Sequence, residues 1–96
     1  YGQSPKFNVQ RVQRFGSGEI DARIEVEKGI IQGARFYGDF FSGRELSELE
    51  GALTGVRYDE DAVRGKVANL PINEYFFGVT GDEFLQLMFH AGGREA

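Results

Sequence analysis

Cysteine is absent from this 96-residue sequence, and histidine occurs once, as His90. Without cysteine the chain can form neither a disulfide nor a thiolate metal site. A single histidine leaves almost nothing from which to build a histidine-based zinc site or a Ser-His-Asp triad. We therefore expect neither a metal site nor a catalytic residue in this chain.

Long apolar runs and an excess of positive charge are missing as well. No stretch approaches the roughly twenty apolar residues of a membrane span, and no signal peptide is visible. The 11 basic and 15 acidic residues give a net charge of −4, which argues against nucleic-acid binding. These absences predict a cytoplasmic protein with neither membrane nor nucleic-acid partners.

Residues 1–38 have the alternation of β-strands. The clearest run spans residues 19–28, where charged residues separate apolar ones, so that one face is buried and the other is wet. Ranges 7–15 and 30–37 predict strands before and after it, with 7–15 as an edge strand. The apolar positions of the central run are Ile20, Ala22, Ile24 and Val26. We expect a sheet with one apolar face.

Glycines mark the turns between these strands. Gly16-Ser17-Gly18 predicts a turn rather than a phosphate loop, because neither a GxxxxGK[ST] pattern nor a helix start follows it. Lys28-Gly29 suits a tight reversal with positive φ, and Gly33 indicates a bulge. Strands joined by such short turns run antiparallel, so the prediction is a three-stranded antiparallel meander.

Residues 42–91 have helical periodicity instead. Leucines spaced three and four apart form one stripe over residues 46–53. Two S-x-x-E capping boxes compete for the start of that helix, at Ser42 and at Ser47. We favour Ser47 with Glu50, and we expect Gly55 to end the helix in a left-handed cap.

Two further helices follow. Asp59 predicts the cap of a helix that Pro71 stops, and Thr80 with Glu83 forms a capping box for the last helix. The predicted fold is therefore α+β, with a three-stranded meander in 1–38 and about three helices packed on its apolar face in 42–91.

The two halves meet at Gly38-Asp39-Phe40-Phe41. Gly38 can adopt backbone angles closed to other residues, and Asp39 can set a turn through its own backbone. If the chain is extended here, the two rings point in opposite directions, so that one enters the core and the other is exposed. A turn with both rings buried is the alternative.

Basic residues gather in the first eighteen positions, which contain no acid. Lys6, Arg11 and Arg14 could contact a phosphate or an acidic partner. The alternative is that they are the solvated residues of an edge strand.

Several segments, taken in order, resemble the C-terminal accessory domain of lipoate–protein ligases, and the resemblance runs from Tyr1 to about Leu87. The segments are Ser4-Pro5-Lys6-Phe7, Arg14-Phe15, Val26-Glu27-Lys28-Gly29-Ile30, Gly38-Asp39-Phe40-Phe41, Leu46-Ser47-Glu48-Leu49-Glu50 and Leu53-x-Gly55-x-x-Tyr58. The resemblance implies that residues 1–96 form a single accessory domain with a SufE/NifU-like arrangement and that the catalytic domain is absent from this chain.

Members of that family activate lipoate with ATP to lipoyl-adenylate and pass the lipoyl group to a lysine of an acceptor domain. The resemblance implies a parent enzyme that uses ATP, magnesium and lipoate, none of them bound by this domain. Its partners would be the catalytic domain, in the same or a separate chain, and the lipoyl acceptor domains.

The resemblance also implies a surface that faces the catalytic domain, for which we expect Ser4, Lys6, Asp39, Phe40 and Phe41. Arg11 and Arg14 are the candidates for contact with an anion or an acidic partner. Two alternatives stay open. One is a SufE/NifU-like adaptor, although without cysteine it could neither carry sulfur nor hold a cluster. The other is a structural domain of an unrelated multidomain protein.

Overall fold

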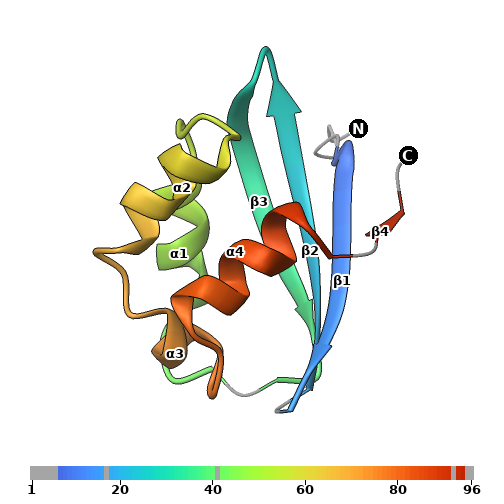
Figure 1. Ribbon diagram of the computed structural model, residues 1–96, viewed down its shortest axis with the longest axis vertical. Coiled ribbons are helices and arrows are strands. Elements are labelled where there is room, and N and C mark those ends of the chain that lie inside the picture. Colours follow the sequence, from blue (N-terminus) through green and yellow to red (C-terminus); the bar gives the residue numbers. More distant parts are fainter. Residues whose placement is uncertain (1–6, 17, 41, 92, 95–96) are drawn as a thin grey trace, which may run out of the picture.

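The computed structural model describes residues 7–16, 18–40, 42–91 and 93–94. Strands come first and helices second, as the sequence predicts, with one short strand at the end (Figure 1). The elements are β1 (Val9–Phe15), β2 (Gly18–Glu27), β3 (Ile30–Gly38), α1 (Leu46–Leu53), α2 (Glu60–Val67), α3 (Ile72–Tyr75), α4 (Gly81–Phe89) and β4 (Gly93–Arg94). The predicted α+β class is confirmed.

All strand pairs of the sheet are antiparallel, and the order is β3-β2-β1-β4. The meander is confirmed, and β2 pairs on both sides. The edge position expected for residues 7–15 is wrong along part of the strand, because β4 pairs with Gln10 and Arg11. This fourth strand was not predicted, since two residues are too few to show an alternating pattern.

The first strand is shorter than the predicted range 7–15. It begins at Val9, and the side chain of Asn8 continues the ladder in place of backbone groups. Asn8 Oδ1 accepts from the Val26 amide at 2.8 Å, and its Nδ2 donates to the Val26 carbonyl at 2.7 Å. A side-chain amide can replace a strand residue in this way because it carries the same donor and acceptor pair as the backbone.

The tight turn and the bulge of the meander are both present. Lys28 and Gly29 have φ of 54° and 79°, which are the angles of a two-residue hairpin turn. Glu25 pairs with Gly33 and Val26 with Ile31, so one residue of β3 has no partner opposite it. That extra residue is the bulge predicted beside Gly33.

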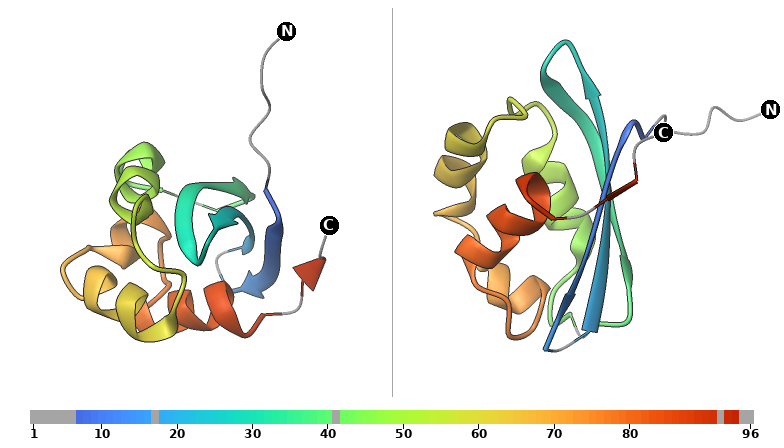
Figure 2. Two further views of the ribbon diagram at one scale, coloured as in Figure 1. Left: turned by 90° about the horizontal axis from the view of Figure 1, so that it is seen from above. Right: turned by 45° about the vertical axis from the view of Figure 1, so that its right-hand side comes forward.

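The helices cover one face of the sheet and leave the other face bare (Figure 2). This arrangement follows from the alternation in β2, where Ile20, Ala22 and Ile24 are fully buried while the residues between them lie on the opposite face. An antiparallel sheet can keep one wet face of this kind. Within the residues described, no helix has the length and apolar character needed to cross a membrane.

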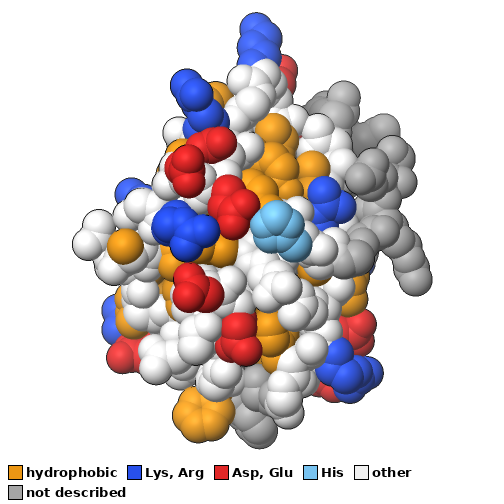
Figure 3. Space-filling model, viewed as in Figure 1, with side chains coloured by type: hydrophobic (Ala, Val, Ile, Leu, Met, Phe, Trp, Pro, Cys, Tyr) orange, Lys and Arg blue, Asp and Glu red, His pale blue; other side chains and the backbone are white. Residues whose placement is uncertain are grey.

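The surface of the helical layer has mixed charge. Acidic and basic side chains are interspersed on the face seen in Figure 3. Arg64 pairs with Glu60 at 3.2 Å and with Asp82 at 3.5 Å, and His90 Nε2 lies 3.1 Å from the other oxygen of Glu60. Exposed pairs of this kind contribute little to stability.

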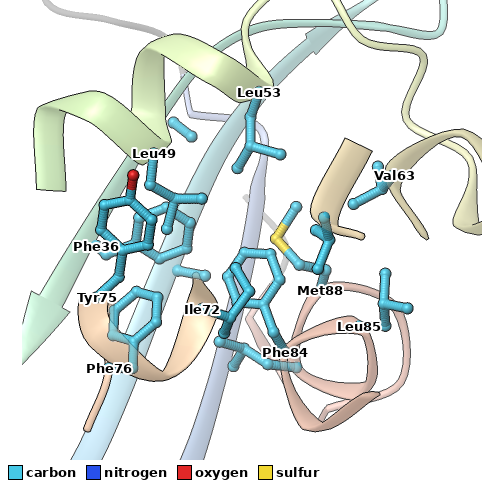
Figure 4. Close-up of a cluster of buried hydrophobic side chains, with 14 of the residues drawn as sticks. Phe36, Leu49, Leu53, Val63, Ile72, Tyr75, Phe76, Phe84, Leu85 and Met88 are labelled. Carbon is cyan, nitrogen blue, oxygen red and sulfur yellow. The ribbon is translucent and has the colours of Figure 1, made fainter. Parts of the chain in front are cut away.

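The core lies between the sheet and the four helices. Figure 4 shows the rings of Phe36, Phe76 and Phe84 gathered with aliphatic side chains from α1 and α4. Leu49 and Leu53 of the predicted stripe are fully buried, which confirms that α1 packs on the sheet. These side chains supply the apolar burial that stabilises the domain.

Two predicted helix caps are confirmed. Asp59 Oδ2 accepts from the Ala62 amide at 3.1 Å at the start of α2. Thr80 and Glu83 form a complete capping box at the start of α4. After Pro71 the chain forms the four-residue helix α3.

The predicted cap of α1 is wrong. The helix begins at Leu46, its N-cap residue is Glu45, and the Glu45 side chain forms no cap hydrogen bond. Glu50, the acid of the favoured capping box, instead accepts from the Phe36 amide at 3.3 Å and lies 3.5 Å from Arg35. The Glu50 carboxylate, which the sequence predicts to cap the start of α1, therefore binds to the edge of β3 instead.

The end of α1 also differs in part from the prediction. Gly55 has the expected positive φ of 90°. Its amide, however, donates to the Ile31 carbonyl at 2.8 Å rather than to a carbonyl of α1. Gly55 thus turns the chain back onto β3 instead of capping the helix.

Candidate functional site

Gly38 and Asp39 close the end of the β2–β3 pair. Asp39 Oδ1 accepts from the Glu19 amide at 3.0 Å. Gly38 has φ of 139°, and a Cβ there would collide with the carbonyl oxygen of Glu19. A Cβ on Gly18, with φ of 141°, would in the same way meet the carbonyl of Asp39. The first half of the Gly38-Asp39-Phe40-Phe41 motif is therefore needed by the fold itself.

The carboxylate of Asp39 is exposed but firmly held. Its hydrogen bond from the Glu19 amide lowers its pKa, and its own backbone amide and the positive charge of Arg14 lower the pKa further. Hydrogen bonds to the charged form of a carboxyl group favour that form. The end of the sheet thus presents a fixed negative charge to solvent.

The ring of Phe40 points toward the core. It is half-buried, and its ring meets that of Phe76 edge-on with centroids 5.0 Å apart. Phe76 in turn packs against Phe36 at 5.3 Å and Phe84 at 5.9 Å. Phe40 is therefore attached to the aromatic centre of the core. Phe41 lies outside the described residues, so the predicted division between the two rings stays a prediction.

The connection that follows the motif is fastened to α3. The Gly43 amide donates to the Glu74 carbonyl at 2.8 Å. Arg44 reaches both Glu48 and Glu74, at 3.2 and 3.1 Å. Figure 1 shows α3, this connection and the β1–β2 turn at the same end of the molecule. That end thus combines segments that are far apart in sequence.

The other predicted site residues are distributed differently. Ser4 and Lys6 lie outside the described residues. Val9 begins β1 at the end of the sheet opposite Asp39 (Figure 1).

Arg11 and Arg14 face opposite sides of the sheet. Arg11 pairs with Ala22, whose side chain is in the core, so Arg11 lies on the helix-covered side and is half-buried. Arg14 pairs with Glu19, which precedes the buried Ile20 and so faces the side without helices. Arg14 therefore lies on that side and is exposed. The structure does not bring them together as one anion site. Their separation follows from strand geometry, since residues three apart point in opposite directions.

A groove of about 530 Å³ lies between α2, α3 and the start of α4. Its lining mixes apolar residues such as Leu70 and Leu85 with Arg64, Asn73 and Asp82. Neither this groove nor the exposed ring of Phe77, which is 67% accessible, was predicted. No local pattern could indicate them, because both depend on how α3 packs. The described part of the chain contains no cluster of three or more His, Asp or Glu side chains able to hold a metal ion.

Comparison with known proteins agrees with the resemblance seen in the sequence. Residues 4–88 match the family described as "Bacterial lipoate protein ligase C-terminus". Lipoate-protein ligase LplJ of Bacillus subtilis is 36% identical over 89 residues, which cover 93% of this chain and 27% of the relative. A lipoate–protein ligase of Streptococcus pyogenes is 34% identical over 93% of this chain and 26% of its own length. Lipoate–protein ligase 1 of Staphylococcus aureus is 31% identical over 92% of this chain and 27% of its own length.

The chain belongs to the family of bacterial lipoate protein ligase C-terminal domains. It spans about a quarter of the length of the curated relatives that it matches. This finding removes the alternative of a domain from an unrelated multidomain protein. The likeness to SufE and NifU proteins stays a prediction.

Proposed function

We propose that this chain is the accessory domain of a lipoate–protein ligase. It assists the ATP-dependent activation of lipoate to lipoyl-adenylate and the transfer of the lipoyl group to a lysine of an acceptor protein. The observation that carries this proposal is the family match over residues 4–88, together with relatives named lipoate–protein ligases in which the matched part is about a quarter of the chain.

In this proposal the chemistry belongs to a catalytic domain in the same or a separate chain, which binds ATP, magnesium and lipoate. The accessory domain contributes shape and charge, supplies no catalytic residue and works in the cytoplasm. Its contribution is the closing of the site during activation, since closure excludes water and completes the catalytic geometry. Lipoyl acceptor domains approach once the accessory domain has moved away.

The end of the sheet at Asp39 supports a docking role. Asp39 is exposed and ionised, and its position is set by the Glu19 amide. A charge that is already oriented loses little conformational freedom when a partner binds it. We propose that Asp39 and Phe40 face the catalytic domain together with Ser4, Lys6 and Phe41, and that Arg14 and Arg11 meet an anion or an acidic partner separately.

The test is ATP–pyrophosphate exchange dependent on lipoate. Exchange would be measured with residues 1–96 alone, with the catalytic part of the ligase alone, and with the two mixed. We expect no exchange from residues 1–96, weak exchange from the catalytic part and a clear increase on mixing. Exchange by residues 1–96 alone would contradict the assignment of chemistry to the other domain. An unchanged rate on mixing would contradict the accessory role.

A matched pair of variants tests the part played by Asp39. Asp39→Asn removes the exposed charge at the end of the sheet, whereas Asp61→Asn removes an exposed charge from the first turn of α2. We expect the first variant to weaken the increase on mixing and the second to leave it unchanged. If both variants weaken the increase equally, the net charge of the domain governs the effect and the position of Asp39 does not.

A further inference from the structure

Phe77 is the most exposed large apolar side chain in the described part of the molecule. Its accessible fraction is 67%, against 48% for Tyr37, the other such residue. The Tyr37 ring has a partner, because the Arg23 guanidinium lies 5.1 Å from its centroid. Among the described residues, no ring or cation contact involves Phe77. Phenylalanine is enriched at protein–protein interfaces relative to the rest of the surface, so the surroundings of this ring bear on whether it marks one.

The fold does not require an apolar side chain at position 77. Phe76 and Val79, on either side, are fully buried and fasten this loop to the core. Gly78 between them has a left-handed φ of 83°, which turns the chain. Phe77 is thus held outward by neighbours that point inward. A polar residue at position 77 could adopt the same backbone conformation, and no aromatic ring would then be exposed to water.

The position of Phe77 is at the Asp39 end of the sheet. Phe76, its neighbour in the chain, meets the ring of Phe40 with centroids 5.0 Å apart. The connection after β3 is bonded to α3 through the Gly43 amide and the Glu74 carbonyl, and α3 leads directly into Phe77. Figure 1 shows these segments at one end of the domain. A fixed exposed ring therefore lies in the same region as the fixed charge of Asp39.

Charged side chains lie on α3, which precedes this ring, and on the connection that is bonded to α3. Arg44 and Glu74, which form an ion pair at 3.1 Å, have side chains that are 43% and 55% exposed. An apolar anchor with a polar rim is the usual composition of a protein–protein interface. Aromatic anchors carry a large share of the binding energy in such interfaces.

We propose that Phe77 is an anchor by which this domain docks onto the catalytic part of its ligase. The inference rests on the proposed function and names a residue of that interface. The occupant is the catalytic part because the matched relatives are almost four times as long as the segment that this chain covers. In those relatives the matched segment and the rest of the ligase belong to one chain, and such linkage gives the rest of the ligase a high effective concentration at this domain.

The test uses the accessibility of position 77, which does not depend on activity. Phe77→Cys introduces the only thiol of this domain, because the natural sequence has no cysteine. Its rate of alkylation by a maleimide would be measured by mass spectrometry of the labelled peptide, in residues 1–96 and in the intact ligase. Tyr37→Cys is the matched control, since it places a thiol at the other exposed aromatic position. Thermal melts of both variants would show that each domain is folded.

We expect the thiol at position 77 to react about tenfold more slowly in the intact ligase than in residues 1–96, because an interface excludes the reagent. The thiol at position 37 should react at similar rates in both. Equal rates at position 77, together with an exchange rate that Phe77→Ser leaves unchanged, would overturn the proposal. Protection in residues 1–96 that increases with concentration would overturn it too, since the occupant would then be a second copy of this chain.

Failure of the proposed function would look different. In that case, deleting this domain would leave lipoate-dependent exchange by the intact ligase unchanged, whatever the alkylation rates. If deletion lowers exchange while Phe77→Ser leaves it unchanged, the accessory role stands and the assignment of Phe77 is wrong. Phe77→Ser, with Tyr37→Ser as its control, adds a readout in activity. We expect about a tenfold lower exchange rate from the first variant and little change from the second.

Discussion

Three phenylalanines at one end of the domain have the same side chain but differ in exposure. Comparing them shows how burial of a ring affects the free energy of unfolding. Phe76 is fully buried, Phe40 is half-buried, and Phe77 is 67% exposed. Phe76 touches three other rings, at Phe36, Phe40 and Phe84, with centroids 5.0 to 5.9 Å apart. Truncating each ring to alanine should therefore cost free energy of unfolding in the order Phe76, Phe40, Phe77.

The magnitudes follow from the position of each ring. Removing a fully buried phenylalanine costs about 3–5 kcal/mol, from lost transfer energy and the cavity left behind. Phe40→Ala should cost less, roughly 1.5–3 kcal/mol, since that side chain is only partly removed from water. Phe77→Ala should lie within about 0.5 kcal/mol of the parent chain, as substitutions on exposed surface do.

Urea unfolding is the appropriate assay, supported by thermal melts. A domain of this size is stable by roughly 5–14 kcal/mol, so Phe76→Ala removes a large part of the total. Phe76→Leu, which keeps most of the apolar volume, provides a folded variant at the same position. In thermal melts each 1 kcal/mol corresponds to about 4–8 °C for a domain of this length.

A double-mutant cycle isolates the contact between Phe40 and Phe76. Their edge-on geometry predicts a coupling of about 0.5–1.5 kcal/mol beyond area burial. If Phe77→Ala costs as much as Phe40→Ala, exposure does not govern the cost of truncation and the predicted order is wrong. If Phe40 and Phe76 show no coupling, their edge-on contact does not contribute to stability.

Three further predictions concern the sheet end and the helix caps. Gly38→Ala should destabilise the domain by more than about 1 kcal/mol in urea melts, because its Cβ would collide with a backbone carbonyl. Gly16→Ala, which has open space around it, should be nearly neutral. Thr80→Ala should cost about 0.5–2 kcal/mol through loss of a capping box, whereas Ser47→Ala should leave stability almost unchanged. Asp39→Asn should remove a part of stability that is present above the unfolded-state pKa of Asp39 and is lost as the pH falls through its lowered folded-state pKa.

Each of these outcomes has a clear opposite. Equal melting of Gly38→Ala and Gly16→Ala would show that the close approach of the strands relaxes without cost. A loss for Ser47→Ala as large as that for Thr80→Ala would restore the predicted capping box of α1. An identical pH dependence of stability for Asp39→Asn and the parent chain, measured by urea melts across the acidic range, would show that its hydrogen bond with the Glu19 amide is not formed.

Local sequence determined most of the elements of this fold. The alternation over residues 19–28, the Lys28-Gly29 reversal and the caps at Asp59 and Thr80 all have the predicted conformation. Each depends on the preferences of a few neighbouring residues, because a strand face, a tight turn or a capping box is complete within one short segment. The order and the antiparallel pairing of the meander follow from the same short turns.

Tertiary packing decided the rest. The carboxylate of Glu50 could bond to its own helix start or to the free edge of β3, and only packing placed the Phe36 amide within 3.3 Å of it. The pairing of β4 with β1 joins two residues to a strand about eighty positions earlier, and no local pattern encodes such a contact.

The surface was decided in the same way. Arg11 and Arg14 are close in sequence, yet the pleat of β1 directs them to opposite sides of the sheet. Phe76 and Phe77 are adjacent and chemically identical, and only the packing of α3 buries one and exposes the other. The exposure of a side chain is a property of the assembled core, because it depends on which distant segments cover it.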